Sequence, residues 1–281
     1  MRQAESFSGG SNDLLERAAE RLGPLFRGVP LRSSVRSLFH FLLMLRTRGR
    51  GLERVLPGGE KLRVLPQQRF LSWNLDEYYA FRKAIEPGEV ALDIGANAGA
   101  YSLLFGAWVQ PGGRVFAFEP DSHAFQALQD HIQLNGLRSV VTAIPKAVAD
   151  FTGTAAFLTG KSFGDHHLAA GPASNISGST QVGCTTVDAF CQQNQLVPRL
   201  IKIDVEGAEL SVLRGSRQTI ARHRDSLGLF VELHPSVWRE RGMRREEFEA
   251  ELMAQSLRIE PLVAGADVWK TEGICVRLRP V

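Results

Sequence analysis

Short apolar runs alternate with helical segments along most of this 281-residue chain, and this alternation restricts its fold more than any other feature. The runs lack the in–out pattern of half-exposed strands, so they are typical of parallel strands covered on both faces. Strand–helix alternation predicts a doubly wound α/β sheet. The predicted strands are 90–94, 114–118, 140–144, 200–203, 227–233 and 273–278, and the predicted helices are 76–84, 101–108, 122–134, 209–214 and 245–255.

A glycine-rich turn, Asp93-Ile94-Gly95-Ala96-Asn97-Ala98-Gly99, follows the first of these strands. Gly95 and Gly99 allow backbone angles and close approaches that a Cβ would prevent, and the first amides of the next helix are free to bind a polar ligand. Dinucleotide-binding loops have the pattern Gly-x-Gly-x-x-Gly, which admits a pyrophosphate. Here Asn97 replaces the second glycine. This departure favours a nucleoside cofactor without a pyrophosphate, with a nicotinamide-dependent oxidoreductase as the alternative.

The next predicted strand ends in Phe118-Glu119-Pro120, and Glu119 follows Asp93 by 26 residues. Ligands of open α/β sheets bind at the carboxyl ends of the strands, so we expect the Glu119 carboxylate beside the glycine-rich turn. A carboxylate at this place can accept hydrogen bonds from both hydroxyls of a ribose. The alternative is that Glu119 only caps the following helix.

A second acidic cluster lies in the run Leu200-Ile201-Lys202-Ile203-Asp204-Val205-Glu206-Gly207-Ala208-Glu209. The macrodipole of the next helix accounts for Glu206 and Glu209 but leaves Asp204 unexplained. A further buried strand ends in Glu232-Leu233-His234. The carboxyl ends of parallel strands share one edge of the sheet, so the two acids and the imidazole that end these strands are predicted to converge on one cleft.

Three ordered motifs make the chain resemble the FkbM family of S-adenosylmethionine-dependent methyltransferases over roughly residues 75–280. The motifs are 93–102, 118–120 and 200–209, and the run 186–190 also matches. The resemblance implies a mostly parallel, seven-stranded class I methyltransferase (Rossmann-like) sheet with one antiparallel strand. It also implies S-adenosylmethionine as cofactor and O-methylation of a hydroxyl on a sugar or other small molecule.

Residues of these motifs, together with residues at the ends of other predicted strands, are assigned to the cofactor and to catalysis. The predicted cofactor-binding residues are Asp93, Gly95, Asn97, Gly99, Tyr101, Glu119, Pro120 and Ala147, the last from its position after the third strand. The predicted catalytic residues are Asp204, Glu232 and His234.

A hydroxyl acceptor must lose its proton as its oxygen attacks, so a base is expected within reach. His234 is a candidate because an imidazole ordinarily titrates at about pH 6.5. Alternatively, His234 is a strand-end histidine bonded to backbone, and Asp204 or Glu232 takes the proton or holds a Mg²⁺ ion. We favour proton transfer by these groups and assign no metal ligand.

Charge divides the chain into two parts. Residues 1–63 carry 12 Lys and Arg against 6 Asp and Glu, a net charge of +6, whereas the remainder carries 21 against 24, a net charge of −3. We therefore expect a basic, α-helical N-terminal extension over 1–70, with amphipathic stretches at 14–22 and 35–45. The methyltransferase domain is expected over 71–281, with an insertion or hairpin at 150–188 near the active-site mouth.

Cysteine content and hydropathy favour a cytoplasmic protein. The three cysteines are odd in number and lack metal-site spacing, and the longest apolar run, 38–45, is far shorter than the ~20 residues of a membrane span. We expect a small-molecule or glycan acceptor and no nucleic-acid partner. Two further interactions are left open by the sequence: weak contact of the basic extension with a membrane, and formation of a homo-oligomer. A non-catalytic, methyltransferase-like binding module is the second alternative to the enzyme.

Overall fold

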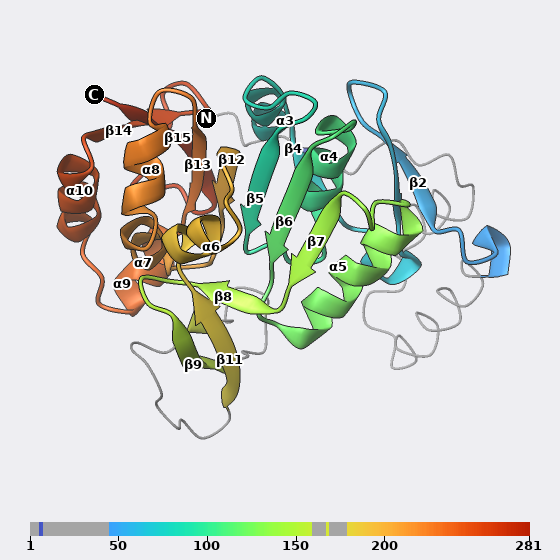
Figure 1. The fold of residues 1–281 in the computed structure, drawn as a ribbon, viewed down its shortest axis with the longest axis horizontal. Coiled ribbons are helices and arrows are strands. Elements are labelled where there is room, and N and C mark those ends of the chain that lie inside the picture. Colours follow the sequence, from blue (N-terminus) through green and yellow to red (C-terminus); the bar gives the residue numbers. More distant parts are fainter. Residues whose placement is uncertain (1–5, 8–44, 159–166, 169–178) are drawn as a thin grey trace, which may run out of the picture.

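The computed structural model describes residues 6–7, 45–158, 167–168 and 179–281. Its centre is a seven-stranded sheet with the order β14-β15-β13-β12-β5-β6-β7 (Figure 1). The strands are β5 (Val90–Ile94), β6 (Arg114–Phe118), β7 (Val141–Ile144), β12 (Pro198–Ile203), β13 (Gly228–Leu233), β14 (Leu257–Pro261) and β15 (Ile274–Pro280). Only the pairs that include β15 are antiparallel, so one strand of this sheet opposes the rest. The predicted sheet is confirmed.

Helices cover both faces of this sheet (Figure 1). One face packs against α3 (Leu75–Arg82), α4 (Ala100–Trp108) and α5 (Ser122–Leu134). The other packs against α6 (Val187–Gln193), α7 (Glu209–Arg214), α8 (Arg217–His223), α9 (Pro235–Glu240) and α10 (Arg245–Ala254). Successive strand residues point to opposite faces, so Ala91 and Leu92, both buried, belong to different hydrophobic clusters. Burial on both faces explains why the strands read as continuous apolar runs.

The order of the strands creates a topological switch between β5 and β12. From β5 the chain runs through β6 to β7 on one side, and β12 then pairs with the other side of β5. Ligands of open α/β sheets bind in the crevice beside such a switch. The backbone N–H of Asp204, just after β12, donates to the carbonyl of Ile94 over 2.9 Å. The glycine-rich turn and the second acidic cluster therefore meet at this edge.

The described part of the N-terminal extension contains a β-hairpin, where the sequence analysis predicted helix. β2 (Leu52–Val55) pairs antiparallel with β3 (Lys61–Val64), and the 3-10 helix η2 (Pro66–Gln68) follows. Buried and less buried residues alternate along both strands, which is the period of a strand with one covered face. The predicted helices at 14–22 and 35–45 lie outside the described residues, apart from Leu45.

This hairpin is held against α5 by polar contacts. The backbone N–H of Leu65 donates to Nε2 of His131 over 2.9 Å. The side chain of Asn135 both accepts from and donates to the backbone of Arg63, at 2.7 and 2.8 Å. Residues 52–65 thus pack on the sheet's helical layer and contribute to the same core.

After β7 the chain enters a second, four-stranded sheet, whose strand order is β10-β9-β11-β8. Its strands are β8 (Lys146–Val148), β9 (Gly153–Leu158), β10 (His167–Leu168) and β11 (Ser179–Thr185). The segment 150–188 contains the antiparallel pair β9–β11. In a separate two-stranded sheet, β1 (Ser6–Phe7) pairs with β4 (Trp73–Asn74). None of the described helices combines the length and the apolar character needed to cross a membrane.

Candidate active site

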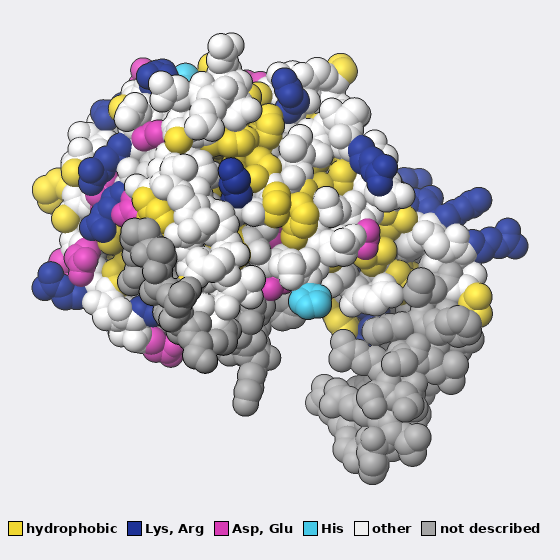
Figure 2. Space-filling view, turned by 60° about the horizontal axis from the view of Figure 1, so that its bottom comes forward, with side chains coloured by type: hydrophobic (Ala, Val, Ile, Leu, Met, Phe, Trp, Pro, Cys, Tyr) yellow, Lys and Arg dark blue, Asp and Glu magenta, His cyan; other side chains and the backbone are white. Residues whose placement is uncertain are grey.

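A pocket opens at the carboxyl ends of β5, β6 and β12, where the topological switch predicts a ligand. The pocket is partly open to solvent, and the crevice beside such a switch is where open α/β sheets bind their nucleotide-type ligands. Seen from the side to which these strand ends point, Lys and Arg side chains project mainly from the margins of the molecule (Figure 2). The lining residues are Ile94, Gly95, Asn97, Phe118, Glu119, Pro120, Asp121, Ala124, Lys146, Ala147, Val148, Phe157, Asp204, Val205, Glu206 and Ala208.

The glycine-rich turn is shaped by the close approach of β12. A Cβ on Gly95, whose φ is 81°, would lie 1.7 Å from the carbonyl oxygen of Asp204, so no other residue fits this position. Asn97 also adopts a positive φ of 49°, and its Oδ1 accepts a hydrogen bond from the N–H of Ala98 over 2.7 Å. The turn therefore keeps a backbone path that leaves the pocket open beside β12.

Glu119 is buried at the end of β6 and is bonded to the turn. Its Oε2 accepts from the N–H of Asn97 over 2.7 Å, and its Oε1 accepts from the N–H of Asp121 over 2.8 Å. Burial raises the pKa of Glu119 to about 7, although these two backbone hydrogen bonds oppose the rise. The cap of α5 is Asp121, whose side chain accepts from His123 and Ala124. Glu119 is therefore not the helix cap that the alternative interpretation required.

The wall beyond Glu119 is mostly apolar. Ala147, in β8, lines it as the sequence analysis predicted, together with Pro120 and Val148. Phe157, in β9, adds an aromatic side chain from the segment 150–188. Phe157 is not among the predicted cofactor-binding residues, because the sequence does not show which cavity an apolar residue of a short strand faces.

Three of the predicted cofactor residues, Asp93, Gly99 and Tyr101, are not among those that line the pocket. Asp93 is 1% exposed, and its Oδ2 accepts from Ser102 Oγ over 2.5 Å. Burial raises its pKa. The hydroxyl of Tyr101 accepts from the N–H of Asn74 over 3.1 Å. The side chains of Asp93 and Tyr101 thus bind neighbouring residues of the fold and do not line the pocket.

A buried lysine, 2% exposed, likewise does not line the pocket and pairs with Asp204. Nζ of Lys202 is 2.9 Å from Oδ2 of Asp204 and 5.0 Å from the centre of the Tyr101 ring. Burial alone would lower the pKa of Lys202, but Asp204, Asp93 and Glu232 raise it above the ordinary value. Burial would raise the pKa of Asp204, but Lys202 and His234 bring it below the ordinary value. Asp204 thus stays ionised and is a weak base.

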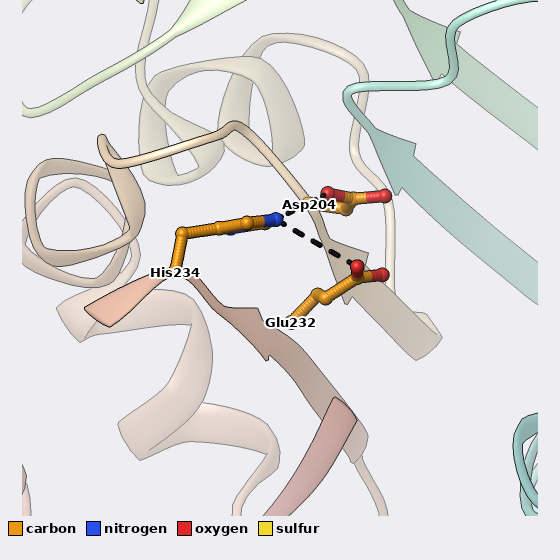
Figure 3. Close-up of side chains that lie close together, drawn as sticks. All are labelled: Asp204, Glu232 and His234. Carbon is orange, nitrogen blue, oxygen red and sulfur yellow. Dashed lines mark ion pairs between the residues drawn. The ribbon is translucent and has the colours of Figure 1, made fainter. Parts of the chain in front are cut away.

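The imidazole of His234 is fixed by Glu209. Nδ1 of His234 lies 2.8 Å from Oε1 of Glu209, and the fully buried Glu209 carboxylate also accepts from Trp238 Nε1 over 2.6 Å. Nε2 of His234 lies 3.8 Å from Oδ1 of Asp204 and 3.7 Å from Oε1 of Glu232 (Figure 3). Nδ1–H therefore donates to Glu209, and Nε2 faces the two carboxyl groups. The three predicted catalytic residues come together, as predicted.

The protonation of this cluster follows from its partners. Burial would lower the pKa of His234, but Glu209, Asp204 and Glu232 raise it to about 9. Burial and the charge of Asp204 raise the pKa of Glu232 well above its ordinary value, and Glu232 hydrogen-bonds to Asp204. Glu232 is therefore the carboxyl that carries a proton and donates it to Asp204 in this hydrogen bond.

From the sequence, Glu209 is explained by its position at the start of a helix, and its contact with His234 is not predicted. Glu209 does begin α7. Its side chain nevertheless reaches His234, which is 25 residues further along the chain. No local pattern reveals this pairing, because it depends on how α7 packs beside the end of β13.

Asp204, Glu232 and His234 each offer one atom within 4.8 Å of the others, a spacing that could also surround a divalent cation. These three side chains suit a divalent cation only in part. One oxygen of Asp204 already binds the Lys202 ammonium, and Glu232 hydrogen-bonds to the same carboxyl. The arrangement favours shared protons over a shared metal ion.

Comparisons with known proteins agree with this architecture. Residues 93–258 match the family model described as "Methyltransferase FkbM domain". The hexuronic acid methyltransferase AglP of Haloferax volcanii is 28% identical over 156 residues, which are 54% of this chain and 59% of that protein. The 2-O-methyltransferase NoeI of Sinorhizobium fredii is 27% identical over 154 residues, covering 50% and 62%. The chain thus spans about three fifths of the length of these two relatives.

Among solved structures, a crystal structure described as methyltransferase FkbM from Methylobacillus flagellatus is 20% identical to this chain. The similarity covers 69% of this chain and 44% of that one, with a TM-score of 0.47.

Proposed function

Because the chain belongs to the FkbM methyltransferase family, we propose that it is an S-adenosylmethionine-dependent O-methyltransferase that acts on a hydroxyl of a sugar or similar small molecule. One observation carries the proposal. At one edge of the sheet, the Glu119 pocket extends to Asp204, and Oδ1 of Asp204 lies 3.8 Å from Nε2 of a histidine whose ring is oriented by a buried carboxylate. S-adenosylmethionine, when bound, supplies a methyl group on a cationic sulfur.

The pocket residues fit such a cofactor. Each oxygen of Glu119 accepts one backbone hydrogen bond, and a carboxylate oxygen can accept more than one, so the group is free to bind a ribose diol. The apolar wall that includes Ala147 and Phe157 offers a surface for a purine. Gly95 and Asn97 shape the turn between this wall and β12.

His234 is the base that we propose for the acceptor hydroxyl. Glu209 holds the tautomer in which Nδ1 carries the proton, which leaves Nε2 able to take one from the acceptor. Asp204 is less suited to this role because Lys202 stabilises its ionised form. Asp204 and Glu232 instead border the space in front of Nε2 and can orient the hydroxyl.

The acceptor class comes from the relatives. AglP is named for a hexuronic acid and NoeI for a 2-O position, so a sugar hydroxyl is the acceptor that we propose here. We also propose that the reaction needs no metal ion and no nucleic acid. All three cysteines are free and buried, and we propose a cytoplasmic location because free thiols suit a reducing compartment.

Calorimetric titration with S-adenosylhomocysteine and, separately, with NADH tests the cofactor. Binding of S-adenosylhomocysteine alone supports the proposal, and binding of NADH alone contradicts it. Transfer of a labelled methyl group from S-adenosylmethionine to a panel of uronic acids and neutral oligosaccharides then tests the acceptor. Activity that persists in EDTA supports a metal-free reaction. Cofactor binding without transfer to any sugar would favour a binding module instead.

A further inference from the structure

Glu206 lines the same pocket as Glu119, and its carboxylate forms no hydrogen bond or ion pair with any described residue. The residue is half-buried in the loop between β12 and α7 and lines the pocket. Its Oε2 is buried and accepts no hydrogen bond from any described residue. Asp204, two residues earlier, pairs with Lys202 instead. Buried polar atoms are almost always satisfied, so an orphaned carboxylate oxygen in a pocket points to a ligand that satisfies it.

The loop holds Glu206 in place by its backbone. Glu206 has a φ of 49°, a conformation that costs non-glycine residues roughly 1–3 kcal/mol and that clusters at ligand sites. Its carbonyl accepts from Nη1 of Arg241 over 2.7 Å, and the N–H of Gly207 donates to Oε1 of Glu209 over 2.8 Å. The guanidinium of Arg241 thus bonds to the backbone of Glu206. The charges of His234 and Arg241 lower the pKa of the Glu206 carboxyl, but neither forms an ion pair with it among the described residues.

The surroundings of Glu206 favour a cation. Burial, reinforced by the charge of Asp204, raises the pKa of Glu206 to about 7, although the charges of His234 and Arg241 oppose the rise. A positively charged ligand group beside this carboxylate would favour its ionised form and bring the pKa back toward its ordinary value. A neutral or anionic group would give no such gain.

We propose that Glu206 binds the α-ammonium of the amino-acid portion of the cofactor, an inference that rests on the proposed function. The pocket runs from Glu119 at the end of β6, past Gly95 at the end of β5, to Glu206 beyond β12. A cofactor whose ribose binds Glu119 therefore extends its amino-acid portion toward Glu206. An ammonium has three donors and a full charge, which matches the orphaned oxygen.

This assignment replaces Asp93 as the acid that faces the charged part of the cofactor. Oδ2 of Asp93 accepts from Ser102, and its Oδ1 also has no hydrogen-bond partner among the described residues, but Asp93 does not line the pocket, whereas Glu206 does. An acid that recognises an ammonium also disfavours dinucleotides, which have none, and so contributes to cofactor selection.

Calorimetry with a matched pair of ligands tests the inference: S-adenosylhomocysteine and its deaminated analogue, in which hydrogen replaces the ammonium. We expect wild-type protein to bind the deaminated analogue about ten- to a hundred-fold more weakly, the range of one charge-assisted hydrogen bond. Glu206→Gln should weaken S-adenosylhomocysteine by a similar factor and change the analogue by less than about three-fold. Glu119→Gln, which acts on the ribose, should weaken both ligands alike. Glu240→Gln removes the same charge from an exposed residue of α9 and should weaken neither.

The outcomes separate this inference from the proposed function. Equal affinity of wild-type protein for the two ligands overturns the role of Glu206 without any variant, and so does a Glu206→Gln protein that keeps the wild-type preference. If neither ligand binds wild-type protein, the cofactor assignment itself fails. Thermal unfolding of each variant shows whether it is folded, and Glu206→Asp, which keeps the charge, should retain a preference for the ammonium.

Discussion

Nδ1 of His234 lies 2.8 Å from Oε1 of Glu209, a carboxylate that no solvent reaches. This pair leaves Nε2 as the imidazole nitrogen that faces Asp204 and Glu232. A buried carboxylate that orients an imidazole and stabilises its protonated form is a recurrent device in proton transfer. The pair joins the start of α7 to the end of β13, so its geometry depends on the packing of the sheet against one helix.

Above pH 9, where His234 is neutral in both proteins, Glu209→Gln should lower kcat about ten- to a hundred-fold while changing the affinity for S-adenosylhomocysteine by less than about three-fold. The amide keeps an acceptor for Trp238 but loses the charge that stabilises the histidine tautomer. An NMR titration of the His234 ring should show its pKa falling toward the ordinary value. A Glu209→Gln enzyme with unchanged kcat and an unchanged pKa of His234 would remove Glu209 from the mechanism as a positioning residue.

Activity should rise with pH up to about 9, because burial of His234 is outweighed by Glu209, Asp204 and Glu232, which raise the pKa of His234 to about 9. Only the neutral imidazole accepts a proton, so log kcat/KM should increase with a slope near ~1 below that pH. His234→Gln should abolish this limb of the profile. A profile that is flat between pH 6 and 9 in the wild-type enzyme would contradict the assignment of the base.

Stability should change in the opposite direction over the same range. The folded-state pKa of His234 lies above its unfolded value of about 6.5, so its contribution is complete below that pH and is lost as the pH rises through about 9. The contribution is on the order of 3 kcal/mol. Urea unfolding of wild-type and His234→Gln proteins at several pH values measures it, and equal pH dependence of the two proteins would refute it.

Gly95→Ala should abolish cofactor binding or destabilise the fold, because the new Cβ would lie 1.7 Å from the carbonyl oxygen of Asp204. Gly136→Ala is the matched control. Gly136 also has a positive φ, of 68°, but nothing lies within 4 Å of its Cβ position. We expect the control to lose about 1 kcal/mol from backbone strain alone. Equal losses of stability in the two variants would mean that the approach of β12 does not constrain the turn.

Lys202→Met should cost at most about 3–5 kcal/mol of stability, the range for a buried pair, because it leaves the partly buried Asp204 carboxylate without its ammonium partner. Adding Asp204→Asn should recover part of this loss, since the double variant has no uncompensated charge at this pair. Denaturant unfolding of the four proteins in the cycle gives the coupling energy. Losses that simply add would show that the two side chains do not interact.

Much of the fold was predictable from local patterns. Strands such as Val90–Ile94 and Arg114–Phe118 are buried on both faces, and their apolar runs reveal this directly. The hairpin of β2 and β3 was not predicted, because its two strands are short and Arg-rich. Their only signal is an alternation of buried and less buried residues over four residues each. Tyr101 belongs to a motif, but the phase of α4 turns its hydroxyl to the N–H of Asn74 and its ring face to Lys202.

The sequence by itself determined the doubly wound sheet and the edge at which Glu119, Asp204, Glu232 and His234 converge. Both follow from rules that depend on residue order: buried strands read as apolar runs, and parallel strands end on one side. Tertiary structure alone decided which carboxylates are satisfied within the protein and which face the pocket. Glu209 binds His234, whereas Asp93 and Glu206 each keep one oxygen without a partner among the described residues, and of these two only Glu206 lines the pocket. Those differences depend on distances between side chains far apart in the chain, which the spacing of residues does not encode.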